Sequence, residues 1–330
     1  MHLDTVIIGA GAAGLLAAVR AAECGRHVVV LEKNRKPGVK ILISGGTRCN
    51  LTHATDRRGI AEAFGSQGKF LRSALAALGP RELIQLVETE GVPTKVEDSG
   101  KVFPTSDRAA DVLQALLRRL QESGARLVLE EALQSLDREG NGFRLTTSRQ
   151  SLTAERVIVT SGGRSYPKSG TTGDGYRWAE RLGHTVLPTR PALTPLTTAA
   201  AWVRELSGIT LPDVGLRVVR SNELSDEAVR AGAVPVGHSK ISALDDRRGS
   251  FLFTHFGLSG PAPMDISRCI TGCSEPASLS LVCDFVPQWN REQMLEAIQE
   301  ACQSGKRHLG NLVAAWVPGR LAESLVMRLG

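Results

Sequence analysis

The sequence predicts an α/β fold with a parallel β-sheet at its N-terminus, followed by a second domain of mixed strands and helices. Three observations lead to this prediction. Residues 3–32 read as strand, glycine turn, helix and strand; a further apolar strand at residues 156–160 runs into small polar residues; and the character of the chain changes near Leu187. Strands that alternate with helices are typical of parallel sheets. We therefore expect two domains, residues 1–188 and residues 189–330.

The N-terminal segment carries the strongest motif of the chain. An apolar strand leads into a turn with glycines at positions 9, 11 and 14, and this turn opens an alanine-rich helix. In such a turn Gly9 permits the tight bend, Gly11 lets a pyrophosphate approach the backbone, and Gly14 lets the helix pack closely on the strand. Backbone N–H groups at the helix start, such as that of Ala13, attract phosphates. Glu32 ends the next strand, where a carboxylate can bind ribose hydroxyl groups. The segment predicts a nucleotide site.

Local patterns extend the prediction through the first domain. Apolar residues at three- and four-residue steps indicate helices over residues 68–78 and 80–91, and Asp107 is a candidate N-cap for a helix that runs to Glu122. Short strands are expected at residues 126–129, 133–136, 143–147 and 156–160, with a hairpin turn at 139–142. The last of these strands has the composition of a strand buried in a parallel sheet.

The second domain begins where Pro188, Pro191 and Pro195 interrupt the chain. Residues 251–254 predict a strand, and Pro261 suits the first position of the helix after the following turn. Helices are also expected over residues 291–303 and 318–328. Residues 221–248 mix charges with glycine and proline without periodicity, so we expect a long loop or an insertion there.

Composition restricts the class of protein. Apolar residues make up 42% of the 330 residues and charged residues 22%, as in globular proteins. The chain has no run of 18 apolar residues and enters a strand at once, so neither a membrane span nor a secretory signal is expected. The six cysteines form no C-x-x-C pair, which favours reduced thiols in the cytoplasm over a redox disulfide or a zinc site; no metal site is expected.

The chain is basic, with a net charge of +6 and an isoelectric point of ≈ 9.2. This balance favours anionic partners such as RNA, phosphates and nucleotides. Aromatic residues account for only 4% of the chain, which is poor material for stacking single-stranded nucleic acid. Arg247 and Arg248, in the expected irregular segment, are the first positions at which charge reversal would test RNA binding.

Three further segments have compositions suited to a ligand site. Residues 40–50, with Thr52 behind them, offer small residues, hydroxyl groups and backbone donors to a polar ring system. Residues 160–176 form a donor-rich loop after a strand, and ligands bind at this carboxyl edge of parallel sheets. Residues 251–261 place His255 in a turn, from which its ring can donate to a bound ring or a substrate, although most isolated histidines are structural.

Together these segments resemble the HI0933-like, or BaiN-like, family of NAD(P)/FAD-dependent oxidoreductases. The matching segments are residues 9–15 with Glu32, 40–50, 102–104 with Ser106, 161–175 and 252–261. The resemblance implies FAD bound to a glutathione-reductase-like Rossmann domain, which is interrupted by an inserted mixed β/α domain.

The resemblance also implies roles for individual residues. The ADP half of FAD would be held by Gly9, Gly11, Gly14 and Glu32. The ribityl chain and isoalloxazine would lie toward Lys40, Ser44, Gly45, Arg48 and Asn50. Further cofactor contacts are expected from Ala13, Lys33, Gly46, Cys49, Thr52, Ser161, Gly162, Gly163, Gly173 and Asp174. Thr47 stands where the family usually has a third glycine, which puts the close approach of that loop in question.

Family members continue beyond the position of Gly330 into another glycine-rich strand and helix, which return to the nucleotide domain. This chain stops at Gly330, so a fragment or a product with an incomplete cofactor site is expected. We then expect an unpaired sheet edge beside the first strand, little retained flavin, and aggregation or dimerisation through that edge.

A flavin ring carries the redox chemistry of such a protein. The chain has no second G-x-G-x-x-G and no C-x-x-C pair, which excludes a two-nucleotide disulfide reductase. NAD(P)H is therefore expected as a transient reductant, unless another donor supplies the electrons.

Members of the family are connected with reduction of a uridine in ribosomal RNA to dihydrouridine, and others with steroid-like bile acids. Reducing a C=C bond with hydride needs a proton donor for the far carbon, and Cys49 and His255 are the candidate catalytic residues. Alternatively, Cys49 is a small buried residue beside the flavin. The alternative from another class of function is a protein that still binds flavin but catalyses no reaction, as a remnant of such an enzyme. The sequence leaves the oligomeric state open.

Overall fold

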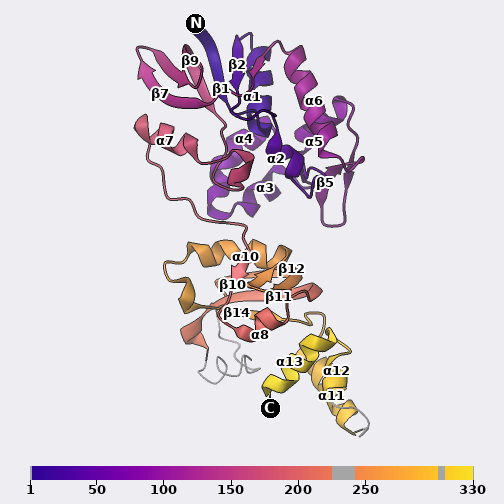
Figure 1. The fold of residues 1–330 in the computed structure, drawn as a ribbon. Coiled ribbons are helices and arrows are strands. Elements are labelled where there is room, and N and C mark those ends of the chain that lie inside the picture. Colours follow the sequence, from indigo (N-terminus) through magenta and orange to yellow (C-terminus); the bar gives the residue numbers. More distant parts are fainter. Residues whose placement is uncertain (1, 225–241, 304–308, 330) are drawn as a thin grey trace. The chain divides into compact units, whose positions relative to one another are not determined.

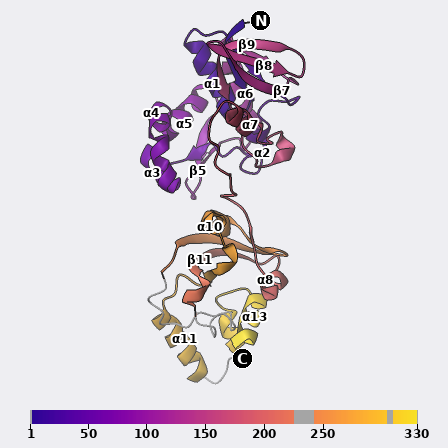
Figure 2. The same cartoon turned by 90° about the vertical axis from the view of Figure 1, so that its left-hand side faces the viewer.

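The structure is a computed structural model that describes residues 2–224, 242–303 and 309–329 (Figures 1 and 2). It consists of two compact units, Met1–Leu187 and Pro188–Gly330. The break falls one residue before the boundary that the sequence predicts. Among the described residues, the first unit holds a six-stranded and a three-stranded sheet and the second a five-stranded sheet, and each unit has buried cores of its own. None of the described helices has both the length and the apolar character needed to cross a membrane.

The first unit is built on a six-stranded sheet with the order β6-β2-β1-β9-β8-β7. β1 (His2–Ile8) pairs in parallel with β2 (Val28–Leu31) on one side and with β9 (Ser151–Val159) on the other. β6 (Arg126–Val128) lies parallel to β2 at the edge. The predicted strand–helix–strand opening is confirmed. The expected unpaired edge beside the first strand is wrong, because β1 has a partner on each side.

β9 takes part in two kinds of pairing. Over residues 151–154 it pairs antiparallel with β8 (Gly142–Thr147), which forms the predicted hairpin with β7 (Leu133–Glu139). From Glu155 to Val159 its only described strand partner is β1. Ile158 and Val159 are 37% and 42% exposed. The prediction that this end of the strand is buried is therefore wrong for the described chain.

Both faces of the sheet are covered around β2. Val28 and Val30 point into a core shared with α1 (Ala12–Glu23) and α6 (Ala109–Glu122). Val29 and Leu31 point the other way, into a core shared with the β7–β8–β9 meander and α7 (Asp174–Arg181). Burial on both faces explains why β2 is apolar at every position.

A smaller sheet and short helices connect β2 to α6 (Figure 1). The three-stranded sheet has the order β3-β5-β4, with β3 (Thr52–His53), β5 (Lys101–Pro104) and β4 (Thr94–Val96). The helices are α2 (Val39–Ile43), α3 (Arg57–Ala63), α4 (Arg72–Ala77) and α5 (Pro80–Thr89). The helix expected over residues 68–78 is divided, because a 3₁₀ segment (Gly65–Leu71) precedes α4.

Asp107 is not the N-cap that the sequence predicts. α6 begins at Ala109, with Arg108 at the N-cap position. Asp107 instead has a φ of 54°, and its carboxylate accepts a hydrogen bond from Lys95. The charged partner, 12 residues away in sequence, takes the carboxylate that would otherwise cap the helix.

The second unit contains a five-stranded sheet with the order β10-β13-β12-β11-β14. Its strands are β10 (Leu196–Thr197), β13 (Gly257–Ser259), β12 (Asp245–Thr254), β11 (Thr210–Arg220) and β14 (Leu279–Asp284). Its helices are α8 (Ala201–Glu205), α10 (Pro261–Gly272), α11 (Arg291–Gln303), α12 (Leu309–Val313) and α13 (Gly319–Leu329). α10 begins at Pro261 as predicted and packs on the sheet core.

The loop expected at residues 221–248 lies in part outside the described residues, which stop at 224 and resume at 242. The remainder of the prediction is wrong at its C-terminal end, because Arg247 and Arg248 belong to β12. Arg248 donates two hydrogen bonds to Asp213 of β11, at 2.8 and 2.7 Å. Arg247 pairs with Asp245 at 2.6 Å. Both arginines are thus strand residues with carboxylate partners.

Candidate nucleotide and flavin site

Three loops meet at the carboxyl ends of the parallel strands in the first unit. The loops follow β1, β2 and β9, and hydrogen bonds join them. The N–H of Gly9 donates to the carbonyl of Leu31 at 2.8 Å. The hydroxyl of Thr160 donates to the carbonyls of Ile8 and Gly9, at 2.9 and 3.0 Å. This bracing role of Thr160 was missed from the sequence, although its place at the end of a strand was visible.

The three glycines of the first turn serve different purposes. Gly9 has a φ of 102°, and a Cβ there would lie 2.8 Å from the carbonyl oxygen of Thr160. A Cβ on Gly14 would lie 1.9 Å from the carbonyl oxygen of Gly9. Both glycines are therefore required by the packing of the chain itself. At Gly11, in contrast, a Cβ would meet no atom within 4 Å.

The space in front of Gly11 suits a phosphate. α1 starts directly after Gly11, and no described side chain caps its first turn. Ala12 and Ala13 are exposed, so the N–H groups of this turn and the positive end of the helix dipole face the open space. An anion placed there would satisfy groups that otherwise need water.

Glu32 is a buried carboxylate at the end of β2, with 7% exposure. One carboxylate oxygen accepts the N–H of Ala10 at 2.8 Å, and the other accepts the N–H of Asn34 at 2.9 Å. These bonds fix the direction of the carboxylate. Each oxygen keeps further acceptor capacity. Glu32 can therefore bind ribose hydroxyl groups beside the Gly11 space, and the residues present fit the ADP half of FAD.

Lys33 and Asp174 tie the loop after β2 to the donor-rich loop after β9. The ammonium group of Lys33 donates to Asp174 at 2.9 Å and to the hydroxyl of Thr172 at 3.0 Å. The hydrogen bond from Lys33, together with bonds from Thr172 and Arg177, lowers the pKa of Asp174 to about 2. These two predicted cofactor residues hold each other, and with them the two loops.

Residues 44–50 form a loop with an unusual backbone. Gly45, Gly46, Thr47 and Cys49 have φ values of 55°, 68°, 72° and 66°. Thr47 thus adopts the left-handed conformation of the glycine that the family resemblance implies, at a cost of roughly 1–2 kcal/mol for a residue with a side chain. A Cβ on Gly45 would lie 2.7 Å from the ring of Phe103, so glycine is required there. The loop keeps its close packing despite Thr47.

Cys49 is buried in the core at the end of this loop, with 5% exposure. Its N–H donates to the carbonyl of Ser44 at 3.0 Å. Burial raises the pKa of the Cys49 thiol, and a hydrogen bond with the side chain of Ser44 opposes this in part. The thiol is therefore protonated at neutral pH and has a proton to give.

Arg48 makes contacts that the sequence did not suggest. Its guanidinium lies over the ring of Phe103, 4.0 Å from the centroid, and pairs with Glu97 at 2.5 Å and with Asp107 at 3.5 Å. Lys95 pairs with Asp107 from the other side. Hydrogen bonding to Glu97 raises the pKa of Arg48 above its ordinary value, and the bond from Lys95 lowers the pKa of Asp107. No pattern in the sequence links residues about 50 positions apart.

The remaining predicted cofactor residues are distributed over the same unit. Lys40 lies in α2, and its ammonium group is 4.0 Å from where a Cβ on Gly162 would lie. Asn50 is exposed, and Thr52 lies in β3. The others lie in the loop after β9 or at the N-cap of α7: Ser161, Gly162, Gly163 and Gly173.

His255 belongs to the second unit. It lies in the turn between β12 and β13, where it is exposed and its ring packs edge-on against Phe256, 4.9 Å between centroids. Among the described residues there is no cluster of three or more His, Cys, Asp or Glu side chains suited to a metal ion.

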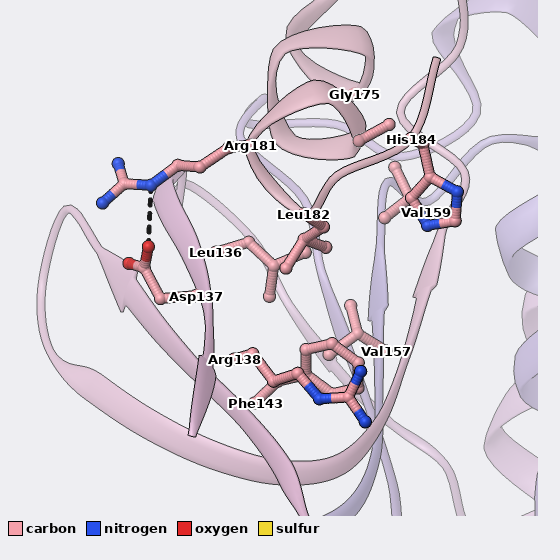
Figure 3. A pocket seen from close by; sticks show the side chains of 11 residues that line it. Leu136, Asp137, Arg138, Phe143, Val157, Val159, Gly175, Arg181, Leu182 and His184 are labelled. Atoms are coloured by element: carbon pink, nitrogen blue, oxygen red, sulfur yellow. Dashed lines mark ion pairs between the residues drawn. The ribbon is translucent and has the colours of Figure 1, made fainter. Parts of the chain in front are cut away.

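A groove of about 400 Å³ lies beside α7 (Figure 3). Apolar side chains form its walls: Leu136, Phe143, Val157, Val159 and Leu182. Arg181 pairs with Asp137 at its rim, at 2.7 Å. Its lining includes no residue of the glycine turn or of the loop after β2, but it does include Val159 and Gly175, which flank the loop after β9.

Parallel strands β1 and β2 joined by this glycine turn and an uncapped helix start, with an acid at the end of the second strand, define a dinucleotide-binding Rossmann domain. The sequence model of the HI0933-like protein Rossmann domain matches residues 3–260. The chain belongs to this family of FAD-dependent oxidoreductases, as the resemblance implied.

Two relatives are similar in sequence to most of this chain. A ribosomal RNA dihydrouridine synthase from Escherichia coli (strain K12) is 31% identical over 328 residues, which cover 98% of this chain and 73% of that protein. A 3-dehydro-bile acid delta(4,6)-reductase from Clostridium scindens is 30% identical over 294 residues, 88% of this chain and 66% of that protein. Among solved structures, the open conformation of a flavocytochrome c3 fumarate reductase aligns with a TM-score of 0.41 at 17% identity, over 64% of this chain and 47% of that one.

Proposed function

We propose that the protein reduces the C=C bond of a uridine in ribosomal RNA to give dihydrouridine, with NAD(P)H as the transient source of electrons. The observation that carries this proposal is the 31% identity to the Escherichia coli ribosomal RNA dihydrouridine synthase, which extends over 98% of the chain. The net charge of +6 supports a polyanionic substrate.

Bound FAD supplies the hydride for such a reduction. The protein must supply a proton to the neighbouring carbon, and this donor has to be protonated at working pH. Cys49 meets that condition because burial raises the pKa of its thiol, and it closes the loop assigned to the ring half of FAD. His255 is the second candidate donor, from the second unit.

The reaction is tested by mapping dihydrouridine in ribosomal RNA from a strain that lacks the gene. We expect the modification to disappear, to return with the wild-type gene, and not to return with Gly11→Val. Cys49→Ala and His255→Gln, expressed in parallel, decide between the two donors: the variant that binds FAD and accepts electrons from NADPH but fails to restore dihydrouridine identifies the donor.

The 30% identity to the bile acid reductase supports a second candidate, reduction of an unsaturated steroid-like ketone. Under argon, the visible flavin band should bleach with NADPH and recover on addition of the substrate. Recovery with a steroid dienone, combined with unchanged dihydrouridine in the deletion strain, would replace the RNA proposal by this second one.

RNA binding makes a separate prediction about salt. Neutralising phosphates releases counterions, so the affinity for ribosomal RNA should fall steeply with rising salt. Because Arg248 is paired with Asp213, charge reversal would place two carboxylates together; Arg248→Gln is the cleaner variant. A phosphate contact by this side chain would appear as a salt slope smaller by about one unit. Affinity that is constant between low and moderate salt would contradict an RNA substrate.

A further inference from the structure

The loop at residues 44–50 needs external support to keep its shape. Thr47 and Cys49 have side chains but φ values of 72° and 66°, in the region that favours glycine. Backbone of this kind persists only where the surrounding structure holds it. Two backbone hydrogen bonds contribute: Ala109 donates to the carbonyl of Thr47, and Cys49 donates to that of Ser44, both at 3.0 Å.

Arg48 provides the support from side chains. Its guanidinium stacks on Phe103 at 4.0 Å, and Phe103, which is 2% exposed, packs directly against Gly45. The guanidinium and the backbone of Gly45 therefore both contact the ring of Phe103. Arg48 is thus coupled through this buried ring to the start of the loop.

The two carboxylates that hold Arg48 come from other segments. Glu97 follows β4, and Asp107 precedes α6. Lys95 pairs with Asp107, so two cations and two carboxylates alternate in a network without net charge. Asp107 is itself held at a φ of 54°.

Such a network contributes little to overall stability. The four side chains are 34–40% exposed, and ion pairs that exposed are screened by water and salt. The network instead fixes the orientation of the Arg48 guanidinium, which is rigid and planar. Orienting this group explains the arrangement better than a contribution to the free energy of unfolding.

We infer that Glu97 and Asp107 are positioning residues, which act through Arg48 to hold residues 44–50 against the ring half of FAD. The inference rests on the proposed flavin-dependent function. The adenine half is held elsewhere, by the glycine turn and Glu32, so the two halves of the cofactor respond to different substitutions.

The test uses the double variant Glu97→Gln/Asp107→Asn, which removes both charges with almost no change in shape. Asp107→Gly is a second variant, because glycine suits a φ of 54° and yet lacks the carboxylate. Glu62→Gln is the matched control, since it removes an exposed carboxylate paired with Arg58 at 2.7 Å on α3. Affinities for FAD and for ADP are measured by calorimetry, and amide hydrogen exchange of residues 44–50 is measured without ligand.

In the double variant we expect FAD affinity to fall about tenfold, equivalent to about 1.4 kcal/mol, while ADP affinity is unchanged. Amide exchange in residues 44–50 should become about tenfold faster, and the absorption band of the bound flavin should shift. Asp107→Gly should likewise lower the affinity for FAD and leave the affinity for ADP unchanged, although the glycine relieves backbone strain at this position. The control should match the wild type.

Equal losses of FAD and ADP affinity, or exchange in residues 44–50 that is unchanged in the double variant, would overturn the inference. A wild-type protein that binds ADP but not FAD would instead refute the proposed flavin-dependent function. The exchange measurement needs no cofactor, so it still decides whether Glu97 and Asp107 hold the loop.

Discussion

Replacing Gly14 by alanine should destabilise the first unit, whereas the same change at Gly11 should spare the fold and weaken FAD binding. A Cβ at Gly14 would lie 1.9 Å from the carbonyl oxygen of Gly9 and 2.7 Å from the hydroxyl of Thr160. The carbonyl is backbone, and the hydroxyl is fixed by two hydrogen bonds, so neither can move cheaply. At Gly11 a Cβ would meet no atom within 4 Å, and a φ of −82° suits any residue.

The expected magnitude follows from these distances. Overpacking an interior typically costs about 1–3 kcal/mol, and a contact of 1.9 Å belongs at the upper end. For a unit of this size, each 1 kcal/mol shifts Tm by about 2–4 °C, so Gly14→Ala should lower Tm by roughly 6–12 °C. Gly11→Ala should change Tm by little, since alanine restricts the unfolded chain but is less favourable than glycine at the N-cap of α1. Gly11→Val fills the space open to the pyrophosphate and should abolish FAD binding.

Melting curves by circular dichroism and titrations with FAD measure both effects in the same three variants. The reasoning about helix packing is refuted if Gly14→Ala melts within about 2 °C of the wild type, which corresponds to less than about 1 kcal/mol. The assignment of the phosphate space is refuted if Gly11→Val binds FAD as tightly as the wild type.

Three other predictions concern charged and nucleophilic side chains. Glu32→Ala leaves two backbone N–H groups without their acceptor, which should cost about 1–3 kcal/mol in urea unfolding and weaken FAD binding about ten- to hundredfold; unchanged values in both assays would contradict its role. Asp174 has a pKa of about 2 in the folded protein against an ordinary 3.8, so its stabilising contribution is complete above pH 3.8 and is lost as the pH falls toward 2; Asp174→Asn should flatten acid unfolding curves in that window, and an identical curve would speak against the assigned ion pair. Alkylation at neutral pH should modify the exposed Cys24 well before the buried Cys49, and equal rates by peptide mass spectrometry would show that Cys49 is accessible.

The parts of the fold that the sequence predicts well are those with local signals. The glycine spacing at positions 9, 11 and 14 lies within one turn and helix, and Pro261 marks the start of α10 by its own backbone restriction. The hairpin between β7 and β8 likewise depends on four consecutive turn residues. In each case the residues that determine the structure are neighbours in the chain.

The errors arise where partners distant in sequence decide the outcome. Asp107 has the side chain of an N-cap, but Lys95 takes its carboxylate. Arg248 reads as part of a polar loop, but the antiparallel pairing of β12 with β11 places it in a strand opposite Gly215, with Asp213 as the partner of its side chain. The network around Arg48 could not be found from the sequence for the same reason, since ion pairs leave no periodic pattern.

The position of β9 between β1 and β8 has a consequence for how the chain folds during synthesis. β2 leaves the ribosome some 20 residues after β1 and can pair with it early, whereas β9 follows β1 by about 150 residues. At translation rates of 5–20 residues per second, β1 waits roughly 8–30 s for its second neighbour. During that interval the edge of β1 that will pair with β9 has no hydrogen-bonding partner in the nascent chain. By then α1 and β2 have been synthesised and can already pack on β1. We expect chaperone capture of stalled nascent chains to be strongest before residue 159 emerges and to fall sharply once β9 has paired.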